Sequence, residues 1–233
     1  MALSLRKYLG VPAIALMNPG WIGRQSFDLS IIPKHDGVRP SASVIVTEGA
    51  LNEMTPATNA SPDEGLVLVG GPSKHHRWDD MAIKNQLTAI LERDPQSRCT
   101  ATSSRRSTTG TDGTLQALAK QYGDRFGYTP ASSTPRGWVA EQLQRCGVCW
   151  ASEDSVSMVY ESLTAGARVG LLPVPRHAGR PGRVVRGIGS LVERGWVETF
   201  KQWQEGTPLP SDRPKLAEAD RVAALMIKRW VGS

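Results

Sequence analysis

Short apolar runs alternate with longer amphipathic stretches after residue 64, and this alternation limits the possible folds more than any other feature of the chain. Strands and helices that follow one another in this way are typical of a parallel sheet with helices on both faces. The sequence therefore predicts an α/β fold. The predicted strands cover residues 65–69, 98–102, 125–128, 147–151 and 168–172, and the predicted helices cover residues 79–92, 111–122, 135–145 and 154–164.

Two further stretches support this interpretation. Within the predicted helix 111–122, Leu115, Leu118 and Ala119 recur at the three- and four-residue spacing that places side chains on one helix face. A last amphipathic helix is predicted over residues 215–230, where apolar residues recur at a similar spacing.

The chain is predicted to divide within residues 52–64, a polar segment with two prolines that is typical of a linker. The predicted domains are residues 1–56 and 57–233. Residues 1–51 are few for an independent α/β domain, so they either pack on the larger part or are the remnant of a domain whose start is absent. Their predicted strands cover residues 13–17, 28–32 and 43–47.

The charge balance excludes few classes of binding partner. The 233 residues include 28 Lys and Arg against 22 Asp and Glu, which gives a net charge of +6. A mild surplus spread along the chain is typical of a soluble basic surface, and an anionic ligand or an acidic membrane surface is the alternative partner. Because no nucleic-acid-binding motif accompanies the charge, no nucleic acid is predicted as a partner.

The three cysteines indicate reduced thiols, because an odd count in a chain of this length does not suit a disulfide framework. Cys146 and Cys149 form a C-x-x-C pattern, but Cys149 falls inside a predicted strand and no second pair completes a zinc site. Buried core cysteines and no metal site are therefore predicted.

The sequence predicts a cytoplasmic protein, with attachment to the inner face of the membrane as an alternative. The longest apolar stretch near the start, residues 11–17, is too short to span a bilayer. It runs into Asn18-Pro19-Gly20 and lacks the small-residue cleavage site of a signal peptide.

Three polar loops follow predicted strands and lead toward predicted helices. They cover residues 70–78, 103–106 and 152–157. In an open parallel sheet, the loops after the carboxyl ends of the strands lie at one edge, where such folds bind ligands. The glycines, hydroxyls, arginines and helix N-termini of these loops favour a ligand that carries phosphate.

The first two loops each allow a second interpretation. Gly70 and Gly71 permit a close approach of ligand and backbone, although an ordinary strand-to-loop turn would use the same residues. The adjacent pair His75-His76 lacks the spacing of a metal-binding pair. Arg105 and Arg106 present planar guanidinium groups that match phosphate geometry, and a pair of solvated arginines is equally consistent with the pattern.

The third loop is the most specific. Asp154 or Ser155 can cap the helix that follows. Ser155 and Ser157 would then lie in its first turn, where free N–H groups favour an anion. Glu161 comes seven residues after Asp154, on nearly the same helix face, where its carboxylate could accept hydrogen bonds from ribose hydroxyls. An ordinary capped helix with an exposed glutamate is the alternative.

The segments "VLVGGPSKHHRW", "TSSRRS" and "SEDSVSMVYESLTAG" together resemble the bacterial branch of the elongated-mitochondria, or mitochondrial-fission, family. That family is related to glycosyltransferases of the GT-B fold. The segments "IALMNPG", "FDLSIIPKHDGV" and "VIVTEGALN" match it in the same order, so that the resemblance covers nearly the whole chain.

The resemblance implies two Rossmann-like domains, a partial one over residues 1–56 and a nucleotide-binding one over residues 57–233. By position, it assigns the diphosphate of a nucleotide sugar to Asp154, Ser155 and Ser157, and the ribose to Glu161. The residues it places along the same cleft are Gly71, Ser73, Ser104 and Arg105.

In the first domain, the resemblance makes His35 of "PKHDG" the candidate general base. A turn residue before Asp36-Gly37 is the alternative for His35. The implied activity is glycosyl transfer in envelope or glycan synthesis, with a nucleotide-sugar substrate and no cofactor. The competing hypothesis is a non-catalytic scaffold of the same fold that works through protein or membrane partners.

Members of this family begin with further strands and helices before the segment that opens this chain. The resemblance therefore implies an N-terminally short first domain whose sheet has an open edge. Unpaired backbone groups at such an edge favour pairing with another chain, so association with a second copy is expected.

Overall fold

The computed structural model describes residues 8–179 and 182–232. The chain divides into two compact units. The first consists of Met1–Glu53 together with Leu216–Ser233, and the second is Met54–Lys215.

The second unit is built on a six-stranded sheet in which every pair of neighbours is parallel. Its strands lie in the order β6-β5-β4-β7-β8-β9. The predicted α/β class is confirmed, and five strands lie within a few residues of their predicted positions. The sixth, β9, was not predicted because it is only two residues long. The bounds are β4 (Ser61–Leu68), β5 (Arg98–Thr102), β6 (Phe126–Thr129), β7 (Cys146–Ser152), β8 (Arg168–Leu172) and β9 (Glu198–Thr199).

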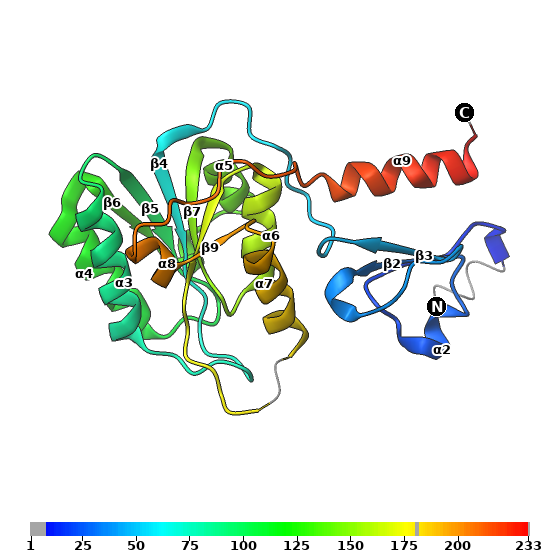
Figure 1. Ribbon diagram of the computed structural model, residues 1–233, viewed down its shortest axis with the longest axis horizontal. Coiled ribbons are helices and arrows are strands. Elements are labelled where there is room, and N and C mark those ends of the chain that lie inside the picture. Colours follow the sequence, from blue (N-terminus) through cyan, green and yellow to red (C-terminus); the bar gives the residue numbers. More distant parts are fainter. Residues whose placement is uncertain (1–7, 180–181, 233) are drawn as a thin grey trace. The chain divides into compact units, whose positions relative to one another are not determined.

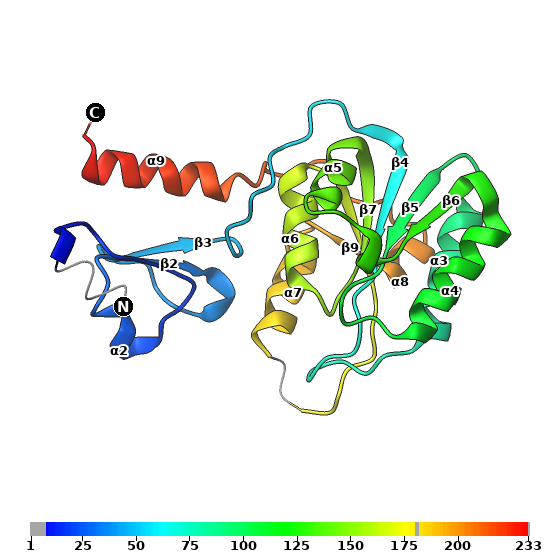
Figure 2. The ribbon, with the colours of Figure 1, turned by 180° about the vertical axis from the view of Figure 1, so that it is seen from behind.

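Helices cover both faces of this sheet (Figures 1 and 2). One face carries α3 (Asp80–Arg93), α4 (Thr109–Tyr122) and α8 (Phe200–Gln204), and the other carries α5 (Trp138–Arg145), α6 (Val156–Ala165) and α7 (Arg183–Glu193). The four predicted helices of this region are present as α3 to α6. Helix α7 was missed because its two glycines lower helix propensity.

Successive apolar side chains of β4 and of Val69, the residue after it, point to opposite faces of the sheet and contribute to the core on both. Val67 and Val69 pack in the cluster formed with α3, α4 and α8, which also contains Leu87, Leu115 and Phe200. Leu66 and Leu68, which are equally buried, point to the opposite face, since successive side chains of a strand alternate. A central strand that is apolar on both sides is typical of a doubly covered parallel sheet.

The first unit contains a three-stranded parallel sheet in the order β1-β2-β3. Apolar side chains of the C-terminal helix α9 pack on it, with Val222 and Met226 in one cluster with Leu29 and Ile31. The bounds are β1 (Ile14–Leu16), α2 (Gly20–Arg24), β2 (Leu29–Pro33), a 3-10 turn at Lys34–Asp36, β3 (Val44–Thr47) and α9 (Glu218–Trp230).

The structure therefore differs from the predicted domain of residues 57–233, because the last helix belongs to the first unit. Hydrogen bonds fix it there. The Glu218 carboxylate accepts from the Glu48 N–H at 2.9 Å, and the Arg221 guanidinium donates to the Val46 carbonyl at 2.7 Å. Sequence order alone could not show that the chain returns to β2 and β3.

The predicted linker is largely part of the second unit. Residues 61–64 begin strand β4. The Ala57 N–H donates to the Ala165 carbonyl at 2.8 Å, and the Gln144 side chain donates to the Thr55 carbonyl at 2.7 Å. The backbone of this segment thus bonds to helices α5 and α6, and the segment is not a free connection.

All three cysteines are free and buried, as predicted. Cys146 opens β7 directly after α5 ends, so the C-x-x-C pattern lies in a strand. Burial raises the pKa of Cys99 to about 11 and that of Cys146 to about 12, and it also raises the pKa of Cys149.

We expect the native chain to react with Ellman's reagent far more slowly than the unfolded chain, because only the thiolate is nucleophilic. The measurement is the rate of absorbance change with and without denaturant. Rapid labelling of a thiol in the native chain would contradict the burial described above.

Within the described residues, no helix is both long enough and apolar enough to cross a membrane.

Candidate functional site

The three polar loops meet at one edge of the sheet, as predicted, because β5, β4 and β7 are neighbours. The Val69 N–H donates to the Thr102 carbonyl at 3.0 Å, which joins the first two loops where they start. The Gly70 N–H donates to the Ser152 hydroxyl at 2.7 Å, which joins the first loop to the third.

Asp154 lies at the centre of this cluster, and its side chain is fully buried. Its Oδ2 accepts a hydrogen bond from the Gly71 N–H at 3.2 Å and pairs with the Arg106 guanidinium at 2.7 Å. Arg106 also donates to the Gly71 carbonyl at 2.9 Å. One carboxylate thus holds all three loops in place.

Asp154 therefore does not cap helix α6, which corrects one of the two capping alternatives. The N-cap residue is Ser155, and its side chain makes no capping hydrogen bond to the described part of the helix. Its hydroxyl lies 3.3 Å from the Ser157 hydroxyl instead. The first-turn N–H groups of α6 are therefore left without the usual side-chain partner.

The two loop glycines are required by the chain's own packing. A Cβ at Gly70 would lie 2.2 Å from Oδ2 of Asp154, and a Cβ at Gly71 would lie 2.3 Å from the Arg106 carbonyl oxygen. The space that was predicted for an approaching ligand is therefore filled by Asp154 and Arg106.

Two of the predicted serines also bond within their own loops. The Ser73 hydroxyl accepts from the His75 N–H at 3.2 Å and from the His76 N–H at 3.1 Å. The Ser104 hydroxyl accepts from the Arg106 N–H at 3.2 Å. Five predicted binding residues thus shape the loops, namely Gly70, Gly71, Ser73, Ser104 and Asp154.

The other predicted binding residues remain available to a ligand. Arg105 is exposed and has no hydrogen-bond or ion-pair partner in the described part of the chain. Ser157 is exposed, and Glu161 follows it by four residues on the same face of α6. Glu161 is partly buried, it bonds to none of the described residues, and burial raises its pKa.

Sequence reasoning missed the contribution of the loop that follows β8. The first loop pairs with the loop after β8 through an antiparallel bridge between His76 and Arg176. The Arg77 N–H donates to the Pro175 carbonyl at 2.8 Å. His76 is thereby only 1% exposed, and burial lowers its pKa. No local signal marks this pairing.

His35 lies in the first unit, within the 3-10 turn that Gly37 ends at φ +70°. This position agrees with the turn alternative, and a catalytic role for His35 stays a prediction. Among the residues that the structure describes, no group of three His, Cys, Asp or Glu side chains could hold a metal ion.

The fold is similar to that of several solved structures. A protein of Listeria monocytogenes, described as a candidate UDP-N-acetylglucosamine 2-epimerase, aligns with a TM-score of 0.62 at 12% identity over 100% of this chain and 72% of its own. A UDP-GlcNAc 2-epimerase from Neisseria meningitidis gives 0.46 at 8%, covering 97% and 72%. The O-GlcNAc transferase of Thermobaculum terrenum gives 0.41 at 13%, covering 87% and 46%.

No curated protein matches the sequence. The sequence profile of the family described as mitochondrial fission ELM1 matches residues 1–230, which confirms the resemblance noted in the sequence. The chain has a GT-B-like α/β fold and belongs to the mitochondrial fission ELM1 family.

Proposed function

We propose that the second unit binds a nucleoside diphosphate sugar, with the diphosphate at the N-terminus of α6 and the ribose at Glu161. The proposed reaction class is glycosyl transfer. The family, the GT-B-like fold and the free groups along one face of α6 support this proposal.

The diphosphate position is supported by the start of α6. Helix N-termini attract anions because their first N–H groups are unpaired and carry partial positive charge. Ser155 leaves these groups uncapped, and the Ser157 hydroxyl adds a donor. Arg105 is the adjacent cation that can pair with phosphate, because Arg106 is held by Asp154.

The single observation that carries the proposal is that Glu161 is partly buried and bonds to none of the described residues. A partly buried carboxylate without a protein partner is costly, since burial penalises its charged form. Ribose hydroxyls would satisfy both of its oxygens. Its place one turn after Ser157 matches the order of diphosphate and ribose in a nucleotide.

The chemistry at this site would be electrostatic. A departing nucleoside diphosphate gains negative charge as the glycosidic bond breaks, and the α6 dipole together with Arg105 would stabilise that charge. A role for His35 of the first unit as a general base stays a separate prediction from the sequence.

The family description favours a second candidate, a non-catalytic module, because it names organelle fission and not an enzymatic activity. Nucleotide binding without turnover, measured with a panel of sugar acceptors, would support this second function. Turnover of a nucleotide sugar would support the first.

Glu161→Ala is expected to weaken nucleotide affinity by about 1–3 kcal/mol, or roughly 5- to 150-fold, because hydrogen bonds to a charged group are lost. Calorimetric titration with nucleoside diphosphates measures the effect. Glu141→Ala on the neighbouring helix α5 is the control, since Glu141 is exposed and unpaired within the described residues. Equal nucleotide affinity of both variants would show that Glu161 does not contact the nucleotide.

The same residue gives a stability signature without ligand. Because the pKa of Glu161 is raised in the folded chain, ionised Glu161 costs stability at neutral pH. This cost is relieved as pH falls from the raised pKa toward the ordinary glutamate pKa of about 4.3. Glu161→Gln should therefore raise the unfolding midpoint at pH 7, and a lowered midpoint would contradict this account.

A further inference from the structure

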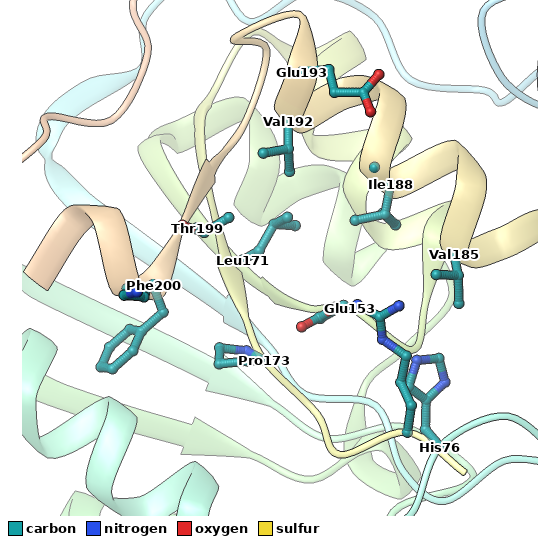
Figure 3. Close-up of a pocket in the computed structure, with 13 residues that line it drawn as sticks. His76, Glu153, Leu171, Pro173, Val185, Ile188, Val192, Glu193, Thr199 and Phe200 are labelled. Atoms are coloured by element: carbon teal, nitrogen blue, oxygen red, sulfur yellow. The ribbon is translucent and has the colours of Figure 1, made fainter. Parts of the chain in front are cut away.

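A cavity of about 420 Å³ lies between α7, β8 and the start of α8 (Figure 3). Its size is within the range of small-molecule sites. Leu171, Ile188 and Val192 point into it, and Pro173 and Phe200 complete its apolar wall. The walls belong to the second unit alone and are distinct from the exposed face of α6.

Gly189 on α7 lines this cavity, and no packing contact explains it. A Cβ built at Gly189 meets no atom within 4 Å, and its φ is not in the left-handed region. Glycine inside a helix is unfavourable relative to other residues. The space above the α7 backbone is therefore open for something other than the chain's own side chains.

Among the polar residues that line the cavity, His76 pairs with Arg176 through the antiparallel bridge, and Glu153 is close enough to Arg176 for their charges to interact. Figure 3 shows Glu153 and His76 in the lower half of the view, whereas Glu193 lies by α7 at the top. Glu153 is partly buried, burial raises its pKa, and the positive charge of Arg176 offsets part of this rise. Burial favours neutral His76 as well, so that these three residues combine one anion, one cation and one neutral group.

This combination selects the chemistry of the ligand. An anionic head group of the ligand would be repelled by Glu153, and a cationic head group would be repelled by Arg176. A neutral head with several hydroxyls can donate to Glu153 and accept from Arg176 at the same time. We propose that the cavity binds a neutral glycolipid-like amphiphile, whose hydrocarbon chain lies along α7 and whose hydroxylated head lies at Glu153 and Arg176.

The test is calorimetric titration of the full chain with n-octyl β-glucoside below its critical micelle concentration. Each buried methylene should raise affinity about fourfold, so the octyl glucoside should bind about 15-fold more tightly than hexyl glucoside. Glucose alone and octanoate should bind more weakly than octyl glucoside. Absence of octyl glucoside binding would overturn the proposal, and octanoate binding at equal or greater strength would overturn the neutral head.

Gly189→Leu supplies the decisive variant. Its side chain would fill the cavity, and leucine favours helix over glycine, so we expect the chain to fold and lose octyl glucoside binding. Gly113→Leu on α4 is the matched control, because Gly113 also has open space around it and lies away from the cavity. Binding that survives in Gly189→Leu at the strength of Gly113→Leu would place the amphiphile elsewhere on the chain.

Discussion

Gly71→Ala should lower the free energy of unfolding by at least about 3 kcal/mol, with a fall of roughly 6–12 °C in the unfolding midpoint. The new Cβ would lie 2.3 Å from the Arg106 carbonyl oxygen and 2.4 Å from its carbon. These are backbone atoms of a loop fixed by its own hydrogen bonds, so that they cannot move aside cheaply. The effect should be present without any ligand.

The control for this substitution is Gly113→Ala. Gly113 is exposed in the middle of α4, and its Cβ position is empty. Alanine there should stabilise the chain by about 0.5–1 kcal/mol, because it favours helix over glycine. Thermal unfolding of both variants decides the matter. If Gly71→Ala were as stable as Gly113→Ala, the close packing of the first two loops would be wrong.

Arg106→Ala should cost about 3 kcal/mol of stability, since it leaves the buried carboxylate of Asp154 without its cation. We place the value at the lower end for buried ion pairs because the Arg106 side chain is 42% exposed. Arg105→Ala, one position earlier, should change stability by less than about 0.5 kcal/mol.

A double-mutant cycle with Asp154→Asn tests the pairing directly. With a neutral side chain at position 154, removal of Arg106 no longer leaves a buried charge unpaired. The double variant should therefore lose less stability than the two single variants together, by about 0.5–3 kcal/mol. Strict additivity in urea unfolding would show that the two side chains do not depend on each other.

The contrast between Arg105 and Arg106 shows where sequence reasoning ends. The pattern placed two arginines after a strand and gave no physical reason to separate them, and only the family resemblance assigned Arg105 to the ligand. Which guanidinium turns inward depends on the hydrogen-bonded turn at Ser104 and on the buried carboxylate that comes 48 residues later. Asp154 and Ser155 present the same problem, because both are good capping residues and only the packing decides.

The sheet itself could be predicted because its signal is local. Strands such as Arg98–Thr102 and Arg168–Leu172 fall at their predicted bounds, since each is a short run between turn residues and helices. The pairing of His76 with Arg176 and the return of α9 to the first unit could not be predicted. Both depend on segments about 100 residues or more apart, and no sequence pattern within either segment indicates which segment it pairs with.

Direct nucleotide binding tests the central claim, which is that the free face of α6 holds a nucleoside diphosphate. The measurement is the unfolding midpoint of the full chain with a panel that includes uridine, guanosine, adenosine and thymidine diphosphates, checked by calorimetry. A ligand at 100 times its Kd should stabilise the fold by about 2.7 kcal/mol, because it binds only the folded state. We predict such a shift for at least one nucleotide, reduced in Arg105→Ala and in Glu161→Ala. No shift and no heat of binding across the panel would contradict the claim.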